Sequence, residues 1–255
     1  MKTVILAGGL GTRLREETEF KPKPMVPIGD KPIIWHIMQT YSKFDFKDFI
    51  ICAGYKGEII SEYFYNFVPN NYDFNVEIGI NNKIQTFGKI NELGWKVTVA
   101  KTGSDTNTGG RIHKVKKYLN NETFMCTYGD GLADINITNL LKFHKSHGKI
   151  ATLSAVNPVS RFGVLETGDN FEVLSFEEKP ISEGRINAGY FVFEPEIFNY
   201  IGENSVLESE VLARLAFDKQ LRMYEHDGFW QAMDTYRETL LLNDLWKNDI
   251  APWKV

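Results

Sequence analysis

The stretch VILAGGLGTRLREETEFKPKPMVPIGDKPII, residues 4–34, decides the fold that we expect for this chain. It begins as an apolar, β-branched run and then turns into a loop rich in glycine and positive charge. The loop includes the glycines Gly8, Gly9 and Gly11 and the cations Arg13, Lys21 and Lys23. Glycine lets backbone N–H groups approach a ligand closely, and exposed N–H groups beside fixed cations favour an anion. The stretch therefore predicts a buried strand that leads into a phosphate-binding loop.

The two common phosphate loops do not fit this stretch. A Walker A loop needs G-x-x-x-x-G-K-[ST], whereas Thr12 and Arg13 follow Gly11. The dinucleotide fingerprint G-x-G-x-x-G would begin at Gly9 and would require glycine where Leu14 stands. We therefore expect neither a P-loop ATPase nor a nicotinamide-dependent dehydrogenase.

Similar apolar runs recur along the chain, at residues 48–54 (DFIICAG), 124–129 (FMCTYG) and 151–156 (ATLSAV). Amphipathic segments such as residues 31–44 lie between them. Strands buried on both faces that alternate with helices are typical of an α/β fold with a doubly wound, mostly parallel mixed sheet. Residues 70–97, rich in Asn and Gly, read as small β insertions with a long loop. Because no linker or repeat interrupts the chain, we expect residues 1–255 to form a single domain.

The segment ITNLLKFHKSHG predicts a helix with recognisable ends. Asn136 or Thr138 is a candidate N-terminal cap, and Gly148 is a candidate C-terminal glycine. His144 and His147 are three residues apart, as in some metal pairs, but no third ligand is nearby in the sequence. We therefore expect these two histidines to lie on a solvated helix face.

The bulk composition argues for a small-molecule partner and a cytoplasmic location. The formal net charge is −4, whereas a nucleic-acid surface needs an excess of Lys and Arg. Cys52 and Cys126 stand far apart in apolar runs without a CxxC spacing, which indicates reduced core thiols. No stretch approaches the roughly 20 apolar residues of a membrane helix. We therefore expect no nucleic-acid partner and no membrane association.

The segments LAGGLGTRL (6–14) and KPKPMVPIGDKPII (21–34) together resemble the opening of the sugar-1-phosphate nucleotidyltransferases. The resemblance is specific because two separate elements occur in the right order. It extends over most of the chain, through TGGRI (108–112), YGDG (128–131), FEEKP (176–180), INAGYFVF (186–193) and GFWQAMDTYRE (228–238). It implies a Rossmann-like, GT-A-like nucleotidyltransferase domain that transfers CMP from CTP to α-D-glucose 1-phosphate. The products would be CDP-glucose and pyrophosphate.

Nucleotidyl transfer makes a definite demand on side chains. The attacking phosphate oxygen is already anionic at neutral pH, so no general base is required. Catalysis then depends on holding two polyanions in line and neutralising their charge. The reaction therefore predicts carboxylates for Mg²⁺ and a cation at the α-phosphate, without a Ser/His/Asp triad.

Two aspartates are the candidate Mg²⁺ ligands. Asp130 follows an apolar strand in YGDG, and Asp234 precedes a capping-box pattern, Thr235-x-x-Glu238, that predicts a helix start. From the residues alone, each aspartate is equally a turn or cap residue. The resemblance implies that both bind the metal ion. Asp134 is interpreted as a loop or cap residue.

The resemblance also implies roles for the loop cations and for both substrates. Lys23 would act at the α-phosphate, and Arg13 would contact the phosphates that leave as pyrophosphate. Nucleotide-binding residues would be Leu6, Gly8, Gly9, Gly11, Thr12, Thr108, Gly109, Gly110, Arg111 and Gly129. The acceptor would contact Gly163, Glu178, Lys179 and Asn187.

Two positions depart from the family pattern and leave alternatives open. Lys101 stands where an acidic residue is usual, and Val211 stands where proline is usual. A different phosphate acceptor, such as another sugar 1-phosphate or phosphoglutamine, is therefore an alternative, as is a non-catalytic nucleotide-sugar sensor. The aromatic residues of EYFYNF (62–67) are interpreted as core or subunit contacts, and we expect a homo-oligomer.

Overall fold

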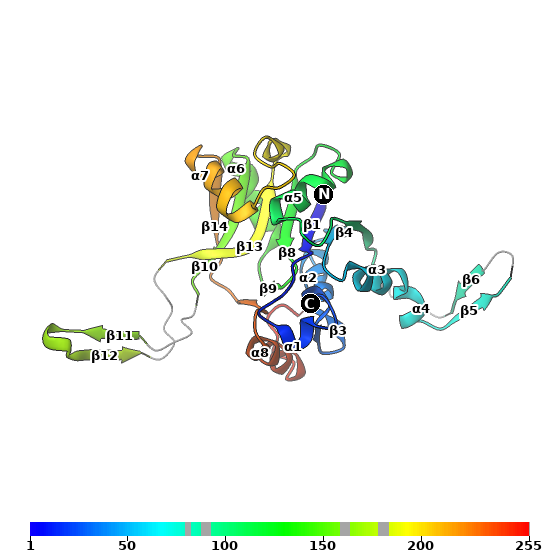
Figure 1. Ribbon diagram of the computed structural model, residues 1–255, viewed down its shortest axis with the longest axis horizontal. Helices are drawn as coiled ribbons and strands as arrows, with labels where there is room; N and C mark the ends of the chain where they lie inside the picture. The colour runs from blue at the N-terminus through cyan, green and yellow to red at the C-terminus, as the bar shows by residue number, and fades with distance from the viewer. Residues whose placement is uncertain (80–82, 88–92, 159–163, 178–183, 255) are drawn as a thin grey trace.

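The computed structural model describes residues 1–79, 83–87, 93–158, 164–177 and 184–254. At its centre lies a seven-stranded sheet in the order β14-β10-β13-β8-β1-β4-β7 (Figure 1). The strands of this sheet are β1 (Lys2–Ala7), β4 (Asp48–Ala53), β7 (Lys96–Lys101), β8 (Phe124–Tyr128), β10 (Ala151–Val156), β13 (Ile186–Phe193) and β14 (Leu221–Glu225). The four apolar runs named from the sequence are strands β1, β4, β8 and β10.

The sheet is mixed and mostly parallel, which confirms the expected fold class. β1 lies parallel to both β4 and β8, β4 is parallel to β7, and β10 is parallel to β14. β13 alone runs antiparallel to its neighbours β8 and β10. Because the parallel strands β1, β4 and β8 end at the same edge, the loops that follow them meet there.

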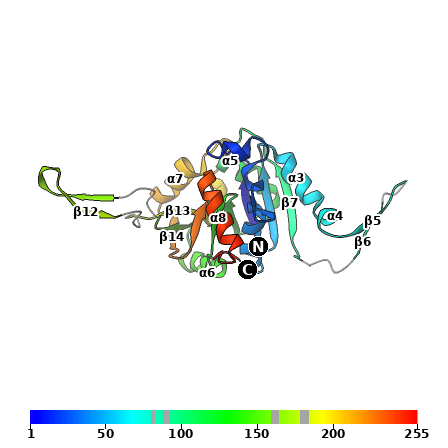
Figure 2. The same ribbon diagram turned by 90° about the horizontal axis from the view of Figure 1, so that it is seen from below.

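Helices cover both faces of the sheet (Figures 1 and 2). They are α1 (Arg15–Thr18), α2 (Ile33–Ser42), α3 (Gly57–Tyr65), α4 (Phe67–Asn71), α5 (Thr108–Val115), α6 (Ile137–His147), α7 (Leu212–Phe217) and α8 (Tyr236–Lys247). Successive side chains of β1 point to opposite faces, so Ile5 packs in the cluster of α2, α6 and α8. Val4 and Leu6 pack in the cluster of α5 and α7. Helices therefore pack on both faces of the sheet, as in a doubly wound fold.

The predicted helix ends are present. Asn136, rather than Thr138, caps α6 by accepting a hydrogen bond from the Asn139 N–H, and Gly148 ends the helix with φ 60°. Thr235 and Glu238 form a reciprocal capping box at the start of α8.

The expectation of a solvated histidine pair is wrong for His144. This side chain is 1% exposed, and its ring nitrogens contact Thr152 Oγ1 at 2.8 Å and Glu194 Oε1 at 3.1 Å. The face of α6 that carries His144 packs onto the sheet, which the spacing of two histidines does not reveal. The two cysteines, Cys52 and Cys126, are buried and unpaired as expected.

Short strand pairs complete the fold, together with 3₁₀ turns at Lys23–Met25, Lys116–Tyr118, Asp169–Phe171 and Pro195–Asn199 and a π-helical turn at Leu207–Val211. The pairs are β2 (Pro27–Ile28) with β3 (Lys31–Pro32), β5 (Phe74–Glu77) with β6 (Lys83–Thr86), β9 (Gly131–Ala133) with β15 (Trp230–Ala232), and β11 (Val164–Thr167) with β12 (Val173–Glu177). The β5–β6 and β11–β12 pairs project from opposite sides of the molecule as two arms (Figures 1 and 2). Within the described ranges, no helix combines the length and apolar character needed to traverse a bilayer.

Candidate active site

A cavity of about 680 Å³ opens where β1 and β8 end. The predicted residues that line it are Leu6, Gly8, Gly9, Gly11, Arg13, Lys23, Thr108, Arg111, Gly129, Asp130, Asn187 and Asp234. They come from the glycine loop, the start of α5, the end of β8, strand β13 and the segment before α8. The fold therefore gathers residues from both ends of the chain around one space.

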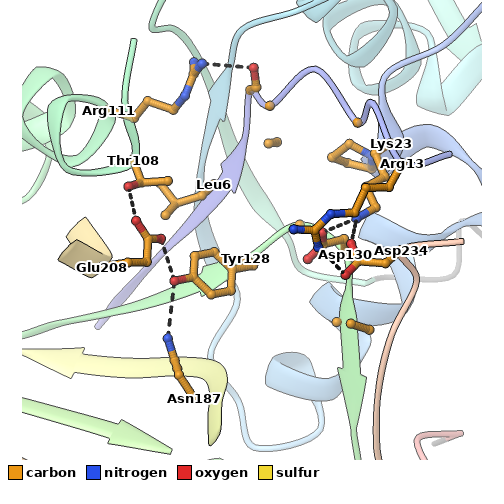
Figure 3. Close-up of a pocket in the computed structure, with 18 of the residues that line it drawn as sticks. Leu6, Arg13, Lys23, Thr108, Arg111, Tyr128, Asp130, Asn187, Glu208 and Asp234 are labelled. Atoms are coloured by element: carbon orange, nitrogen blue, oxygen red, sulfur yellow. Dashed lines mark hydrogen bonds and ion pairs between the residues drawn. The ribbon is translucent and has the colours of Figure 1, made fainter. Parts of the chain in front are cut away.

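Lys23 lies at the centre of a charged cluster in this cavity (Figure 3). Its ammonium contacts Asp130 Oδ2 at 2.6 Å and Asp234 Oδ1 at 2.5 Å. Arg13 Nη1 contacts the other oxygen of Asp234 at 3.0 Å. Two cations and two carboxylates from distant parts of the chain therefore meet within hydrogen-bond distance.

The pKa shifts of Lys23 and Asp234 agree with these ion pairs. Burial alone would lower the pKa of Lys23, but Asp130 and Asp234 outweigh burial and hold the pKa above its ordinary value. Burial would likewise raise the pKa of Asp234, but the hydrogen bond and charge of Lys23, with help from Arg13, hold it below its ordinary value. Lys23 and Asp234 are consequently charged near neutral pH.

The backbone around the two aspartates explains their placement. Asp130 lies two residues after the end of β8, and its carbonyl accepts a hydrogen bond from the Met233 N–H. The Asp234 N–H donates to Glu238 Oε2 at 2.6 Å, so the capping box of α8 also holds this aspartate in position. A backbone link between the two segments therefore brings the carboxylates together.

The donor set at this point fits a hard divalent cation. Oxygens of Asp130 and Asp234 approach the same ammonium nitrogen, so they already converge on one positive centre. Paired carboxylate oxygens that leave room for water and phosphate oxygens are what Mg²⁺ prefers. Among the described residues, no group of three or more His, Cys, Asp or Glu side chains is arranged to hold a metal ion.

Arg111 holds the backbone of the glycine loop by a hydrogen bond. Its guanidinium, 3% exposed as a residue, donates to the carbonyls of Gly8 at 2.9 Å and Gly103 at 2.7 Å, and to Thr102 Oγ1 at 2.7 Å. A Cβ at position 8 would lie 2.0 Å from Arg111 Nη1, so any larger residue there would displace the guanidinium from these hydrogen bonds. Arg111 is a predicted nucleotide-binding residue, and the structure shows in addition that it contacts the backbone of the glycine loop.

Several residues that the sequence predicts for the site either do not line the cavity or lie outside the described residues. Thr12, Gly109 and Gly110 are not among the described residues that line the cavity. A Cβ at Gly109 would lie 2.7 Å from the Ser205 carbonyl, and one at Gly110 would lie 2.2 Å from the Glu203 carbonyl. These two glycines therefore allow α5 to pack closely on residues 203–205. Gly163, Glu178 and Lys179 lie outside the described residues.

The cavity also contains residues that the sequence did not single out, above all Tyr128 and Glu208. Tyr128 directly precedes Gly129 and Asp130, so its place at a strand end was a usable signal. Glu208 comes from the π-helical turn, 80 residues farther along the chain. No local pattern around Glu208 connects it with the glycine loop.

Comparisons with known proteins identify the family and the fold of the chain. The sequence model of the nucleotidyl transferase family matches residues 2–235. Glucose-1-phosphate cytidylyltransferase of Salmonella typhimurium is 49% identical over 257 residues, covering 100% of this chain and 99% of that protein. Two solved structures share the fold. UDP-glucose pyrophosphorylase complexed with UDP-glucose has a TM-score of 0.68 at 18% identity, covering 97% of this chain and 98% of that chain. HddC from Yersinia pseudotuberculosis has a TM-score of 0.66 at 23% identity, with 96% and 99% covered.

Proposed function

The chain belongs to the nucleotidyl transferase family, and from this premise we propose that it transfers CMP from CTP to α-D-glucose 1-phosphate. The products are CDP-glucose and pyrophosphate. The substrates follow from the full-length similarity to the Salmonella typhimurium glucose-1-phosphate cytidylyltransferase. The structural observation that supports the chemistry best is the contact of one lysine, Lys23, with both Asp130 and Asp234.

The reaction needs charge neutralisation and alignment more than proton transfer. An oxygen of the acceptor phosphate forms a bond to the α-phosphorus, while the bond from that phosphorus to the bridging oxygen breaks and pyrophosphate leaves. Lys23 supplies positive charge at the α-phosphate. Arg13, whose side chain is 76% exposed at the cavity, reaches the departing phosphates. Backbone N–H groups of the glycine loop help to hold the triphosphate.

Asp130 and Asp234 are the proposed ligands for Mg²⁺. The ion, when bound, neutralises phosphate charge and helps to keep the phosphates in line. In the structure Lys23 balances the two carboxylates. Lys23 therefore has two sets of partners available, the carboxylates and a phosphate.

The acceptor is proposed to bind on the Asn187 side of the cavity. Gly163, Glu178 and Lys179 remain proposed acceptor residues, with Lys179 at the phosphate and Glu178 at sugar hydroxyls. Lys101 and Val211, the two departures from the family pattern, are not among the described residues that line the cavity, and Val211 is fully buried. Neither departure therefore gives a structural reason to prefer a different acceptor.

We propose that residues 1–255 act as one nucleotidyltransferase domain in the cytoplasm and assemble into a homo-oligomer. The two arms support an assembly because Ile78, beside β5, is 90% exposed and Phe171, beside β12, is 96% exposed. Clustered exposed apolar side chains of this kind are typical of interaction surfaces. Sedimentation velocity of the wild-type protein tests the assembly, and a monomer at micromolar concentration would contradict it.

Pyrophosphate release from purified protein tests the proposed reaction. CTP, UTP, dTTP, ATP and GTP are each supplied with Mg²⁺ and glucose 1-phosphate, and a second panel replaces glucose 1-phosphate by other sugar phosphates and phosphoglutamine. We expect release with CTP and glucose 1-phosphate. Release from CTP with only another phosphate would overturn the acceptor, and nucleotide binding without release in either panel would favour a sensor.

A further inference from the structure

Three side chains from separate elements form a hydrogen-bonded wall of the cavity (Figure 3). Glu208 Oε1 accepts from the Tyr128 hydroxyl at 2.6 Å, and Glu208 Oε2 accepts from the Thr108 hydroxyl at 2.7 Å. Asn187 Nδ2 donates to the Tyr128 hydroxyl oxygen at 3.4 Å. The carboxylate therefore connects the nucleotide side, at Thr108, with the acceptor side, at Asn187.

The chemistry of these groups sets the direction of every hydrogen bond. An ionised carboxylate can only accept, and a hydroxyl has a single proton, so Tyr128 and Thr108 both give their protons to Glu208. The Thr108 oxygen in turn accepts from the Leu207 N–H at 3.0 Å. Toward a ligand, the Tyr128 hydroxyl consequently offers only an acceptor.

The orientation of the Asn187 amide follows from its hydrogen bonds to Gly189 and Tyr128. Asn187 Oδ1 accepts from the Gly189 N–H at 2.8 Å, which places the oxygen on one side and Nδ2 toward Tyr128. An amide nitrogen carries two hydrogens, so Asn187 has a second N–H beside the one that it gives to Tyr128. An acceptor oxygen and a donor N–H thus stand next to each other, as is needed to bind one hydroxyl group.

The Tyr128 ring is held firmly enough to maintain this arrangement. A Cβ at Gly189, where φ is +82°, would lie 2.4 Å from the ring, so glycine allows β13 to pass directly against it. Phe191 contacts the ring edge-on, with centroids 5.6 Å apart. Burial and the neighbouring Glu208 raise the pKa of Tyr128 above its ordinary value, so the hydroxyl keeps its proton.

We propose that Glu208 is a positioning residue for acceptor selection. By accepting the Tyr128 proton, it leaves the Tyr128 oxygen as an acceptor beside the free N–H of Asn187, and the two groups together bind one hydroxyl of the acceptor sugar. This inference rests on the proposed function, since it concerns the sugar that receives CMP. It predicts that the enzyme distinguishes glucose 1-phosphate from the one deoxy analogue that lacks this hydroxyl.

The variant Glu208→Gln tests the inference. Its amide has one accepting and one donating end, so the two hydroxyls can no longer both donate to it. Glu210→Gln is the matched control because Glu210 lies on the same π-helical turn and accepts a hydrogen bond from the Val206 N–H. Kinetic constants are measured with glucose 1-phosphate and with its 2-, 3-, 4- and 6-deoxy analogues.

We expect wild-type protein to lose about 10- to 100-fold in kcat/KM with one analogue, as when a site built for a hydroxyl meets a ligand without it. Glu208→Gln should raise the KM for glucose 1-phosphate about tenfold, change the KM for CTP far less, and abolish most of this discrimination. Tyr128→Phe should abolish the same discrimination, and the double variant should lose no more than either single variant. Glu210→Gln should behave as wild type.

Wild-type discrimination retained in both Glu208→Gln and Tyr128→Phe would overturn the role of Glu208, as would equal effects of Glu208→Gln and Glu210→Gln. Failure of the proposed function is a separate result, because wild-type protein would then release no pyrophosphate from CTP and glucose 1-phosphate. The same comparison is in that case made with the acceptor that supports release. Thermal unfolding of each variant identifies a change that arises from misfolding.

Discussion

The ammonium of Lys23 lies 2.5 Å from a carboxylate oxygen of Asp234, although the two residues are 211 positions apart in the chain. The same ammonium contacts Asp130, so one cation holds both carboxylates in the cavity that the glycine loop lines. This arrangement links the segment that follows the glycine loop with the segment that begins α8. A substitution in the cluster should therefore alter catalysis more strongly than folding.

Asp130→Asn and Asp234→Asn should each lower pyrophosphate release by at least about 100-fold, because each removes a charge that we propose organises the phosphates and Mg²⁺. Steady-state rates at saturating CTP and Mg²⁺ measure the effect. Asp134→Asn is the control, since Asp134 pairs with His226 and is not among the described residues of the cavity. Full activity in both of the first two variants would contradict the catalytic scheme.

Lys23→Met should lower the rate of pyrophosphate release by about 100- to 1,000-fold, as expected for loss of a group that stabilises transition-state charge. Lys21→Met should retain near wild-type activity, because Lys21 forms a surface ion pair with Glu17 at 3.5 Å. Single-turnover measurements separate the chemical step from product release. Equal losses in the two variants would show that general positive charge matters, not the position of Lys23.

Gly110→Ala should destabilise the fold, because its Cβ would lie 2.2 Å from the Glu203 carbonyl. Overpacking of this kind costs about 1–3 kcal/mol in the free energy of unfolding. Gly9→Ala is the matched comparison, since no other heavy atom lies within 4 Å of a Cβ at position 9, which lines the cavity. Urea unfolding should leave Gly9→Ala near wild type, whereas its KM for CTP should rise. The reverse pattern would remove the packing role assigned to Gly110.

His144 should make stability depend on pH near neutrality. Burial lowers the pKa of His144 from its ordinary value of 6.5, and this effect outweighs the neighbouring Glu194. The folded state therefore favours the neutral ring, and this contribution to stability is present above pH 6.5 and is lost as the pH falls through the folded pKa.

Urea unfolding between pH 5 and 8 measures the contribution of His144. The free energy of unfolding should fall more steeply below pH 6.5 for wild-type protein than for His144→Gln. His147, whose pKa is lowered by burial and by His144, remains in both proteins and contributes in the same direction. Parallel pH profiles for the two proteins would contradict the prediction.

Much of the fold could be predicted because its signals are local. The β-branched run at residues 3–7 forms β1, and the Thr235-x-x-Glu238 pattern forms the capping box of α8. The period of apolar residues and the identity of a cap act within a few positions of the chain. Local signals did not predict the burial of His144 in α6, because helical spacing alone does not reveal which face of the helix packs on the sheet.

The sequence by itself determined strands β1, β4, β8 and β10, helices α2, α6 and α8, the position of the glycine loop and the residue types that nucleotidyl transfer needs. Only the tertiary structure decided that β13 lies antiparallel between β8 and β10, that Lys23 contacts both aspartates, and that Glu208 reaches Tyr128. The physical reason is the range of the interactions involved. Propensity, capping and periodicity are local, whereas the cavity depends on packing between segments separated by 80 to 211 residues.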